Sequence, residues 1–108
     1  MKEKRILKRF ATQLNARYGQ KARDGGWEAC TIVDITRRGM GIKFHTEEKI
    51  DTGAIIHLEI DVIKESPPLR VKGILKWIEG GGNVFFGGVE LAEVMDEIEW
   101  TNLIYYMS

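Results

Sequence analysis

Hydrophobic and polar residues alternate along several short segments of this chain. The clearest is residues 56–62 (IHLEIDV), in which every second residue is apolar. Residues 69–72 repeat the pattern, and apolar positions continue as far as Ile78. A period of two places successive side chains on opposite faces of a β-strand, one of them toward a core. Weaker runs of this kind predict further strands at residues 11–18, 27–34, 41–44 and 84–91.

Turn-forming residues separate these segments, at positions 24–26, 51–53, 66–68 and 80–83. Six short strands at close intervals predict an antiparallel barrel or sandwich within residues 11–92. The period then changes, because apolar residues recur at spacings of three and four in Trp100, Leu103, Ile104 and Met107. This spacing predicts an amphipathic helix over residues 94–107 that covers part of the sheet. Asp96 and Glu97 in its first turn suit the helix dipole.

The length, the cysteine content and the apolar runs of the chain limit the kinds of protein that it can be. A chain of 108 residues has room for one domain. Cys30 is the only cysteine, which excludes an internal disulfide and a cluster of thiolates around zinc. The basic start runs into no long apolar stretch, so we expect no signal peptide. No apolar run approaches the roughly 20 residues that cross a bilayer. We therefore expect a cytoplasmic protein with no membrane partner.

The net charge of zero conceals an uneven distribution. The region before residue 25 is mainly basic, whereas the region from Glu90 onward contains no lysine or arginine. The basic residues are Lys2, Lys4, Arg5, Lys8, Arg9, Arg17, Lys21 and Arg23, and the acidic ones are Glu90, Glu93, Asp96, Glu97 and Glu99. This polarity indicates either an anionic partner at the N-terminal end or a solvated basic arm.

Two short motifs carry candidate binding chemistry. Arg5 and Arg9 lie four positions apart just before the first expected strand, and arginine presents a planar fork of donors that matches phosphate oxygens and the edge of guanine. Asp34, Thr36 and Gly39 lie between two expected strands, where the acid and the hydroxyl can shape a turn and Gly39 can supply a positive φ. Each motif alone is better explained as an ordinary solvated arm or an ordinary turn between strands.

Together the motifs resemble the signature of the PilZ domain family, Arg-x-x-x-Arg followed by (Asp or Asn)-x-Ser-x-x-Gly. Asp34 follows Arg9 by 25 positions, which leaves room for an outgoing strand, a glycine turn and a returning strand. Residues 39–42, Trp77, residues 86–91 and the expected C-terminal helix also resemble the family, so that the likeness covers the whole chain. The resemblance implies a mainly β fold: a six-stranded antiparallel Greek-key (split) β-barrel with a C-terminal α-helix.

The resemblance further implies that the chain binds cyclic di-GMP at the rim of the barrel. Arg5 and Arg9 would hold phosphates and guanines, Asp34 would accept hydrogen bonds from a guanine edge, and Thr36, which replaces the family's serine, would donate to a phosphate. The complete set of implied contacts is Lys4, Arg5, Arg9, Asp34, Thr36, Arg38 and Gly39. We expect residues 1–10 to form a mobile arm that folds onto the barrel with the ligand.

Several other residues invite a functional interpretation that we do not favour. His57, Glu59 and Asp61 share one strand face, but solvent-facing residues of this kind are far more common than a metal site. Cys30 is expected to pack as a small apolar group. The glycines at 80–82 predict a hairpin turn and not a phosphate loop. Trp77 and Trp100 are expected in the core or as a lid of the barrel.

Three classes of function remain. The first is a cyclic di-GMP receptor that signals to a protein effector, as a monomer or weak dimer and without a cofactor. The second is a PilZ-like adaptor that acts through protein contacts alone. The third is a small barrel that binds single-stranded nucleic acid, against which the absence of clustered aromatics and the carboxylates near the C-terminus argue. We expect no enzyme, because no catalytic set of residues is present.

Overall fold

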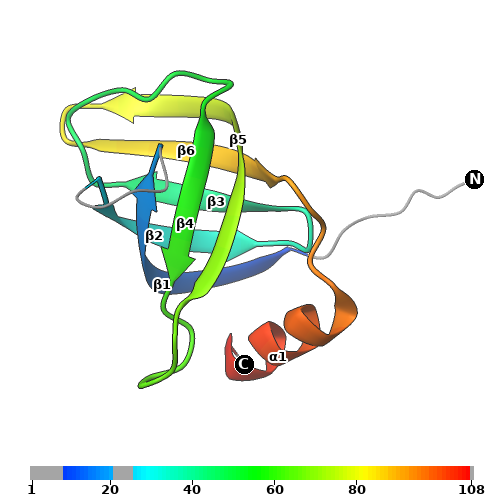
Figure 1. Cartoon of the computed structure of the whole chain (residues 1–108). Helices are drawn as coiled ribbons and strands as arrows, with labels where there is room; N and C mark the ends of the chain where they lie inside the picture. The colour runs from blue at the N-terminus through cyan, green and yellow to red at the C-terminus, as the bar shows by residue number, and fades with distance from the viewer. Residues whose placement is uncertain (1–8, 21–25, 108) are drawn as a thin grey trace, which may run out of the picture.

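The chain folds into a closed barrel of six strands with one helix. The structure, a computed structural model, describes residues 9–20 and 26–107. Figure 1 shows the barrel with the helix beside one end. The elements are β1 (Phe10–Gly19), β2 (Glu28–Ile35), β3 (Gly39–Phe44), β4 (Ile55–Ile60), β5 (Leu69–Gly81), β6 (Val84–Leu91) and α1 (Glu97–Met107).

The strands follow the order β1-β2-β3-β6-β5-β4, and β4 returns to pair with β1. Every neighbouring pair is antiparallel. Strands β1 to β3 are sequential neighbours, and β4 lies on the far side of β1 after the connection across residues 45–54, which is a Greek-key arrangement. The expected Greek-key barrel is therefore confirmed.

The core consists of the inward-facing half of each alternating strand. Its largest fully buried side chains are Phe44, Ile32, Ile35, Ile42, Ile56, Leu58, Ile60 and Leu75. Each such side chain stabilises the fold by about 1.5–3 kcal/mol relative to exposure. Tyr18 packs edge-on against Phe44, with 4.9 Å between ring centroids. Cys30 is also buried in this core, and burial raises the pKa of its thiol to about 12, so it packs as a small apolar residue.

The predicted turns near residues 51–53, 66–68 and 80–83 form, whereas most of the one predicted at 24–26 lies outside the described residues. One helix boundary differs from the expectation. The β5–β6 hairpin turns at Gly82 and Asn83, and positive φ angles of 115° and 74° explain the glycines at 80 and 82. The helix begins at Glu97 and not at residue 94, and the backbone N–H of Met95, just before it, donates to the carbonyl oxygen of Arg37. Asp96 caps the helix by accepting a hydrogen bond of 2.8 Å from the backbone N–H of Glu99.

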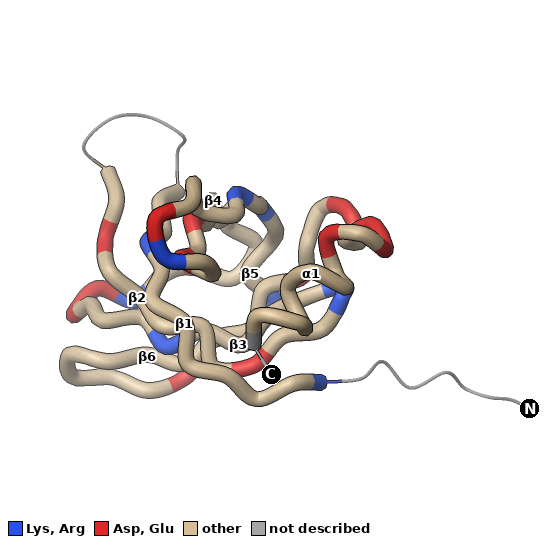
Figure 2. The backbone as a smooth tube through the Cα atoms, turned by 90° about the horizontal axis from the view of Figure 1, so that it is seen from below, with Lys and Arg blue, Asp and Glu red and all other residues tan. Residues whose placement is uncertain are grey.

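Helix α1 packs against one end of the barrel through a small apolar contact. Leu103 of the helix and Met95, just before it, are buried. The half-buried Trp100 lies against Phe10 at the start of β1, with 5.7 Å between ring centroids, which confirms its expected role as a lid residue. In Figure 2, acidic residues mark the segment that leads into the helix. Within the described ranges no helix is both long and apolar enough to cross a membrane.

Candidate functional site

A row of residues crosses the outer face of four adjacent strands. Asp34 on β2 pairs with Gly41 on β3, Gly41 pairs with Gly88 on β6, and Gly88 pairs with Trp77 on β5. Directly paired residues place their side chains on the same face. The row therefore has the carboxylate of Asp34 at one end, the indole of Trp77 at the other, and two glycines without side chains between them.

Two β-bulges bring the end members of this row to the outer face. In β2 the register shifts between Ile32 and Asp34, and in β5 it shifts between Leu75 and Trp77. Without the shifts, Asp34 would face inward like Ile32, and Trp77 would face inward like Leu75, since residues two apart share a face. Each extra residue reverses the alternation, which is how bulges re-aim side chains near binding sites.

The two glycines in the middle of the row are required by the side chains that lie over them. A Cβ on Gly41 would stand 2.8 Å from Oδ2 of Asp34, and a Cβ on Gly88 would collide with the indole of Trp77. The carboxylate therefore leans over Gly41 and the indole over Gly88. Trp77 remains 48% exposed, so part of its surface is available to a ligand.

Arg9 closes the carboxylate end of the row. Its guanidinium lies 3.5 Å from Oδ2 of Asp34, although 25 residues separate the two in the sequence. The other carboxylate oxygen accepts a hydrogen bond of 3.0 Å from the backbone N–H of Gly41, which fixes its direction. The Arg9 side chain is 71% exposed, and it therefore keeps donors directed to solvent.

These residues line one hollow of about 330 Å³ on the outer face of the barrel. Its lining comes from the residue just before β1, from β2, β3, β5 and β6 and from the loop between β2 and β3. It comprises Arg9, Asp34, Thr36, Arg38, Gly39, Met40, Gly41, Lys76, Trp77, Gly88, Val89 and Glu90. Five of the expected contact residues, Arg9, Asp34, Thr36, Arg38 and Gly39, thus meet at one place. Lys4 and Arg5 lie outside the described residues.

Thr36 organises the loop between β2 and β3. Its hydroxyl accepts hydrogen bonds from the backbone N–H groups of Arg38 and Gly39, at 3.1 and 3.0 Å, and donates to the carbonyl of Gly39 at 3.3 Å. These contacts confirm that a hydroxyl shapes the turn by binding nearby amides. The hydroxyl is committed to the loop, which is a different role from the phosphate contact that the resemblance implies.

The expected reason for Gly39 is wrong. Its φ lies outside the left-handed region, where the glycines are Gly53, Gly80 and Gly82. A close approach between strands explains the glycine instead, because a Cβ at this position would stand 2.6 Å from the carbonyl oxygen of Val89. Both partners of that contact are backbone, so a larger residue would force β3 away from β6.

The two arginines of the same loop point to different places. Arg38 is exposed and lines the hollow. Arg37 is half-buried, and its guanidinium donates to the carbonyl oxygen of Met95 from Nε at 3.2 Å and from a terminal nitrogen at 2.8 Å. Arg37 therefore adds no charge to the hollow, and its contacts connect the loop to the segment before α1.

Trp77 is the site residue that the sequence analysis missed. It was expected in the core or as a lid, yet it is half-exposed and lines the hollow. The alternating pattern of β5 places it on the inner face unless the bulge after Leu75 is known. One available signal was the pair Gly87-Gly88 on the neighbouring strand, since adjacent glycines in a strand often mark a close approach of another group.

The face that carries His57, Glu59 and Asp61 is occupied by ion pairs. Arg17 donates to Glu59 at 3.4 Å and to Asp61 at 3.0 and 3.1 Å. The hydrogen bond to Arg17 lowers the pKa of Asp61, and the same contact raises the pKa of Arg17. Among the residues that the structure describes, no group of three His, Cys, Asp or Glu side chains is placed to hold a metal.

Comparison with known proteins places this site in context. The model of the PilZ domain family matches residues 2–108. The inhibitor of motility MotI/DgrA of Bacillus subtilis has a similar fold, with a TM-score of 0.70 and 13% identity over 96% of this chain and 50% of that protein. The PlzA protein of Borreliella burgdorferi, solved in complex with c-di-GMP, gives a TM-score of 0.58 and 17% identity over 97% of this chain and 41% of PlzA.

The chain thus spans half or less of each of these two solved proteins, and identities this low relate the folds alone. No curated protein sequence matches it. The family match, by contrast, runs through both arginines of the first motif and through the whole second motif. The chain belongs to the PilZ domain family.

Proposed function

We propose that this chain is a receptor module for cyclic di-GMP and that the hollow beside Asp34 is its binding site. The observation that carries the proposal is the convergence of Arg9, Asp34 and Trp77 on one face, because these three types of side chain recognise phosphate, a guanine edge and a base surface. Membership of the PilZ family supports it, as does the complex of PlzA with the same dinucleotide.

The carboxylate of Asp34 reads the guanine edge in this proposal. A guanine presents N1–H and N2–H₂ donors on one side, and an ionised carboxylate has acceptor sites for both. The bond from Gly41 already uses one of these sites and holds the group in place. Arg9, 3.5 Å away, pairs with the carboxylate and is itself placed to contact a phosphate or a guanine.

Trp77 supplies the stacking surface. A base that stacks on an aromatic side chain contributes about 1–3 kcal/mol. The glycine strip between Asp34 and Trp77 lets the flat ligand approach the backbone of β3 and β6 without meeting a side chain. In this proposal a guanine edge contacts Asp34 at one end of the row, and the face of a base contacts Trp77 at the other end.

The energies of these contacts reach the range of a physiological receptor. Micromolar binding corresponds to about 8 kcal/mol. Hydrogen bonds to charged groups contribute about 1.5–3 kcal/mol each, so Arg9, Asp34 and one stacked base supply most of that amount. Lys4 and Arg5, which precede the described chain, are proposed to add phosphate contacts by closing over the ligand, as the family motif implies. Ordering of residues 1–10 is then expected to accompany binding.

Calorimetric titration of cyclic di-GMP into the wild type and Arg9→Ala tests the proposal. We expect saturable binding to the wild type and a loss of about tenfold or more in the variant, which corresponds to about 1.4 kcal/mol. Lys49→Ala is the matched control, because it removes the same charge from an exposed residue that does not line the hollow. Its affinity should stay within about twofold of the wild type.

Two results would contradict the proposal. Absence of binding to the wild type would favour an adaptor that acts without the nucleotide. Equal losses in Arg9→Ala and Lys49→Ala, together with binding of arbitrary oligonucleotides that weakens steeply with salt, would indicate a site for single-stranded nucleic acid. Hydrogen exchange of residues 1–10 with and without cyclic di-GMP tests the ordering of the arm, and equal protection in both states would refute it.

A further inference from the structure

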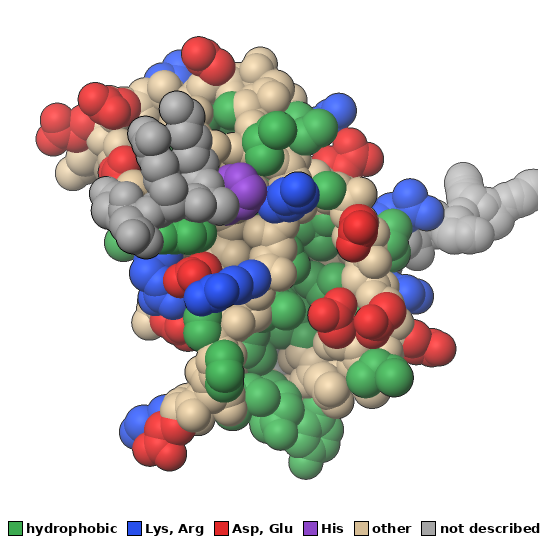
Figure 3. Space-filling view, in the orientation of Figure 1, with side chains coloured by type: hydrophobic (Ala, Val, Ile, Leu, Met, Phe, Trp, Pro, Cys, Tyr) green, Lys and Arg blue, Asp and Glu red, His purple; other side chains and the backbone are tan. Residues whose placement is uncertain are grey.

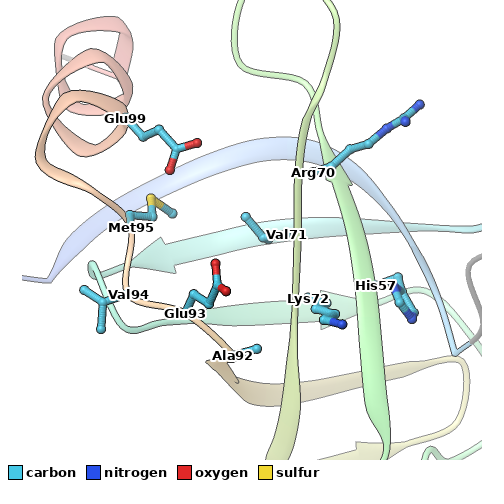
Figure 4. Close-up of a pocket in the computed structure, with 9 residues that line it drawn as sticks. All are labelled: His57, Arg70, Val71, Lys72, Ala92, Glu93, Val94, Met95 and Glu99. Carbon is cyan, nitrogen blue, oxygen red and sulfur yellow. The ribbon is translucent and has the colours of Figure 1, made fainter.

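A second concavity lies between the barrel and the segment that leads into α1. It has a volume of about 400 Å³ and is bounded by β4 and β5 on one side and by residues 92–99 on the other. His57, Arg70 and Lys72 come from the strands, whereas Glu93 and Glu99 come from the opposite wall (Figure 4). We call this concavity the dipolar groove, because its two walls carry opposite charge.

The floor of the dipolar groove is apolar. Val71, Ala92, Val94 and Met95 line it, and Val94 remains 47% exposed. In the space-filling view, basic side chains over β4 and β5 face acidic side chains over α1, with hydrophobic side chains between them (Figure 3). The groove runs open to solvent on this face, unlike a small-molecule site, which encloses most of its ligand.

The opposite charges of the two walls do not pair with each other. Arg70 pairs with Glu59, at 3.0 Å, on its own side of the groove. Lys72, Glu93 and Glu99 form no ion pair with another of the described residues. The backbone N–H of Ala92 donates to the carbonyl oxygen of Lys72 at 2.9 Å and joins the walls at one end. Each wall retains a charge that an occupant of opposite charge can match.

The acidic wall is tied to the loop of the candidate nucleotide site. The guanidinium of Arg37 donates twice to the carbonyl of Met95, and the carbonyl of Arg37 accepts a bond of 3.0 Å from the N–H of Met95. The carbonyl of Arg38 accepts a bond of 2.7 Å from Leu91. Arg37 and Arg38 lie between Thr36 and Gly39, so the loop that borders the hollow also positions one wall of the groove.

We propose that the dipolar groove is a docking site for a segment of a protein partner that carries both acidic and basic side chains, and that Arg37 couples this site to the nucleotide hollow. The acidic side chains of the partner face Lys72 and Arg70, and its basic side chains face Glu93 and Glu99. An apolar side chain between them covers Val71 and Val94. The occupant is a protein segment because the groove is open, apolar along its floor and charged on both sides.

The coupling, although not the groove itself, rests on the proposed nucleotide site. A ligand that fixes the loop from Thr36 to Gly39 also fixes Arg37, and with it Met95 and the acidic wall. If the acidic wall is already fixed, less conformational entropy is lost when the partner binds. Cyclic di-GMP is therefore expected to strengthen docking. Arg37 is a positioning residue in this scheme, since it lines neither the hollow nor the groove and acts through its hydrogen bonds to Met95.

The first experiment tests the groove without nucleotide. The probe is a short synthetic peptide with glutamates at one end, lysines at the other and valine between, and all-glutamate and all-lysine versions serve as comparisons. We expect the mixed peptide alone to shift the backbone NMR signals of Val71, Ala92 and Met95. Absence of these shifts, or equal shifts with all three peptides, overturns the docking site.

Charge reversal separates the groove from general electrostatics. Lys72→Glu is expected to weaken the mixed peptide about fivefold, because one attraction becomes a repulsion at a partly exposed pair. Lys49→Glu makes the same change of charge at an exposed position outside the groove, and its effect should be below about twofold. Equal effects of the two variants would refute the assignment.

The second experiment tests the coupling. Saturating cyclic di-GMP is expected to tighten the mixed peptide about fivefold in the wild type and to leave its affinity unchanged in Arg37→Ala. Arg38→Ala, in which the tie to Met95 is intact, is expected to bind cyclic di-GMP more weakly yet to show the full effect once saturated. An equal effect in all three proteins, or none in the wild type, refutes the role of Arg37.

Parallel calorimetry distinguishes the possible failures. If the wild type bound no cyclic di-GMP, the proposed function and the coupling would both be wrong, whereas the peptide titrations without nucleotide would still decide the groove. If cyclic di-GMP bound and the peptide did not, the receptor would stand and the groove would be rejected. A merely structural role of Arg37 would lower protection of the Met95 amide to the same extent with and without nucleotide.

Discussion

The inner and outer faces of β2, β3 and β6 differ in the size and polarity of their side chains. The inner face carries large apolar side chains that are almost fully buried, such as Ile32, Ile42 and Val89. The outer face of the same strands carries Asp34, Gly41 and Gly88, where the important property is the space that the glycines leave. Residues one or two positions apart therefore serve different purposes, since the first set holds the barrel together and the second shapes a surface for a ligand.

This contrast shows why stability and binding are separable in this barrel. An inner residue contributes through the area that it removes from water and the volume that it fills. The residues of the outer row contribute little burial, and their substitution leaves the core intact. Mutations on one face should therefore change the free energy of unfolding, and mutations on the other should change affinity.

The largest expected effect is on the inner face. Ile42→Ala leaves a cavity in a fully buried position and should lower the free energy of unfolding by about 2–5 kcal/mol, measured by urea unfolding. Lys43→Ala, one residue further on, faces outward and should change it by no more than about 0.5 kcal/mol. Similar losses in both variants would abolish the distinction between the faces.

A smaller effect is expected on the outer face. In Gly88→Ala the new methyl group displaces the half-exposed indole of Trp77, which can rotate toward solvent, so stability should fall by less than about 1 kcal/mol. Loss of the stacking surface should weaken cyclic di-GMP about tenfold in a calorimetric titration. Gly81→Ala is the matched control, because a Cβ there meets no atom within 4 Å. Unchanged affinity in Gly88→Ala would remove Trp77 from the site.

The smallest expected effect concerns the protonation of the core. Burial raises the pKa of the Cys30 thiol from 9.0 to about 12, so the folded state keeps the proton that the unfolded chain loses. The resulting stabilisation is complete below about pH 9 and declines as the pH rises toward 12. Between about pH 9 and pH 10 the free energy of unfolding should fall by roughly 1 kcal/mol. In Cys30→Ala this part of the decline should vanish, and an unchanged slope would show that the thiol is not its source.

The sequence predicted the strands well because each alternates between a buried and an exposed face. All six predicted strands form, including 84–91 with its exact bounds. The convergence of Arg9 and Asp34 was also predictable, since a hairpin returns the second motif to the first. What could not be predicted is where the alternation fails. Neither bulge has a local signature in the sequence, and so the outward direction of Trp77 was missed.

Two other features depend on contacts between distant parts of the chain. The first is the contact of Met95, just before the helix, with Arg37, since the two lie 58 residues apart. The close approach of Gly39 to Val89 follows from the pairing of β3 with β6. Periodicity and turn residues report on neighbours along the chain, and they carry no information about such pairs.

The bulges in β2 and β5 make the site sensitive to chain length as well as to residue type. Removal of Val33 would restore regular alternation and direct Asp34 toward Ile42, into an interior that has no partner for a carboxylate. Removal of Lys76 would do the same to Trp77. A homologue that lacks one residue at either point would keep the residues of its motif and yet lose the recognition surface. The number of residues within β2 and β5 is therefore a stricter criterion for a working receptor than a match to the motif.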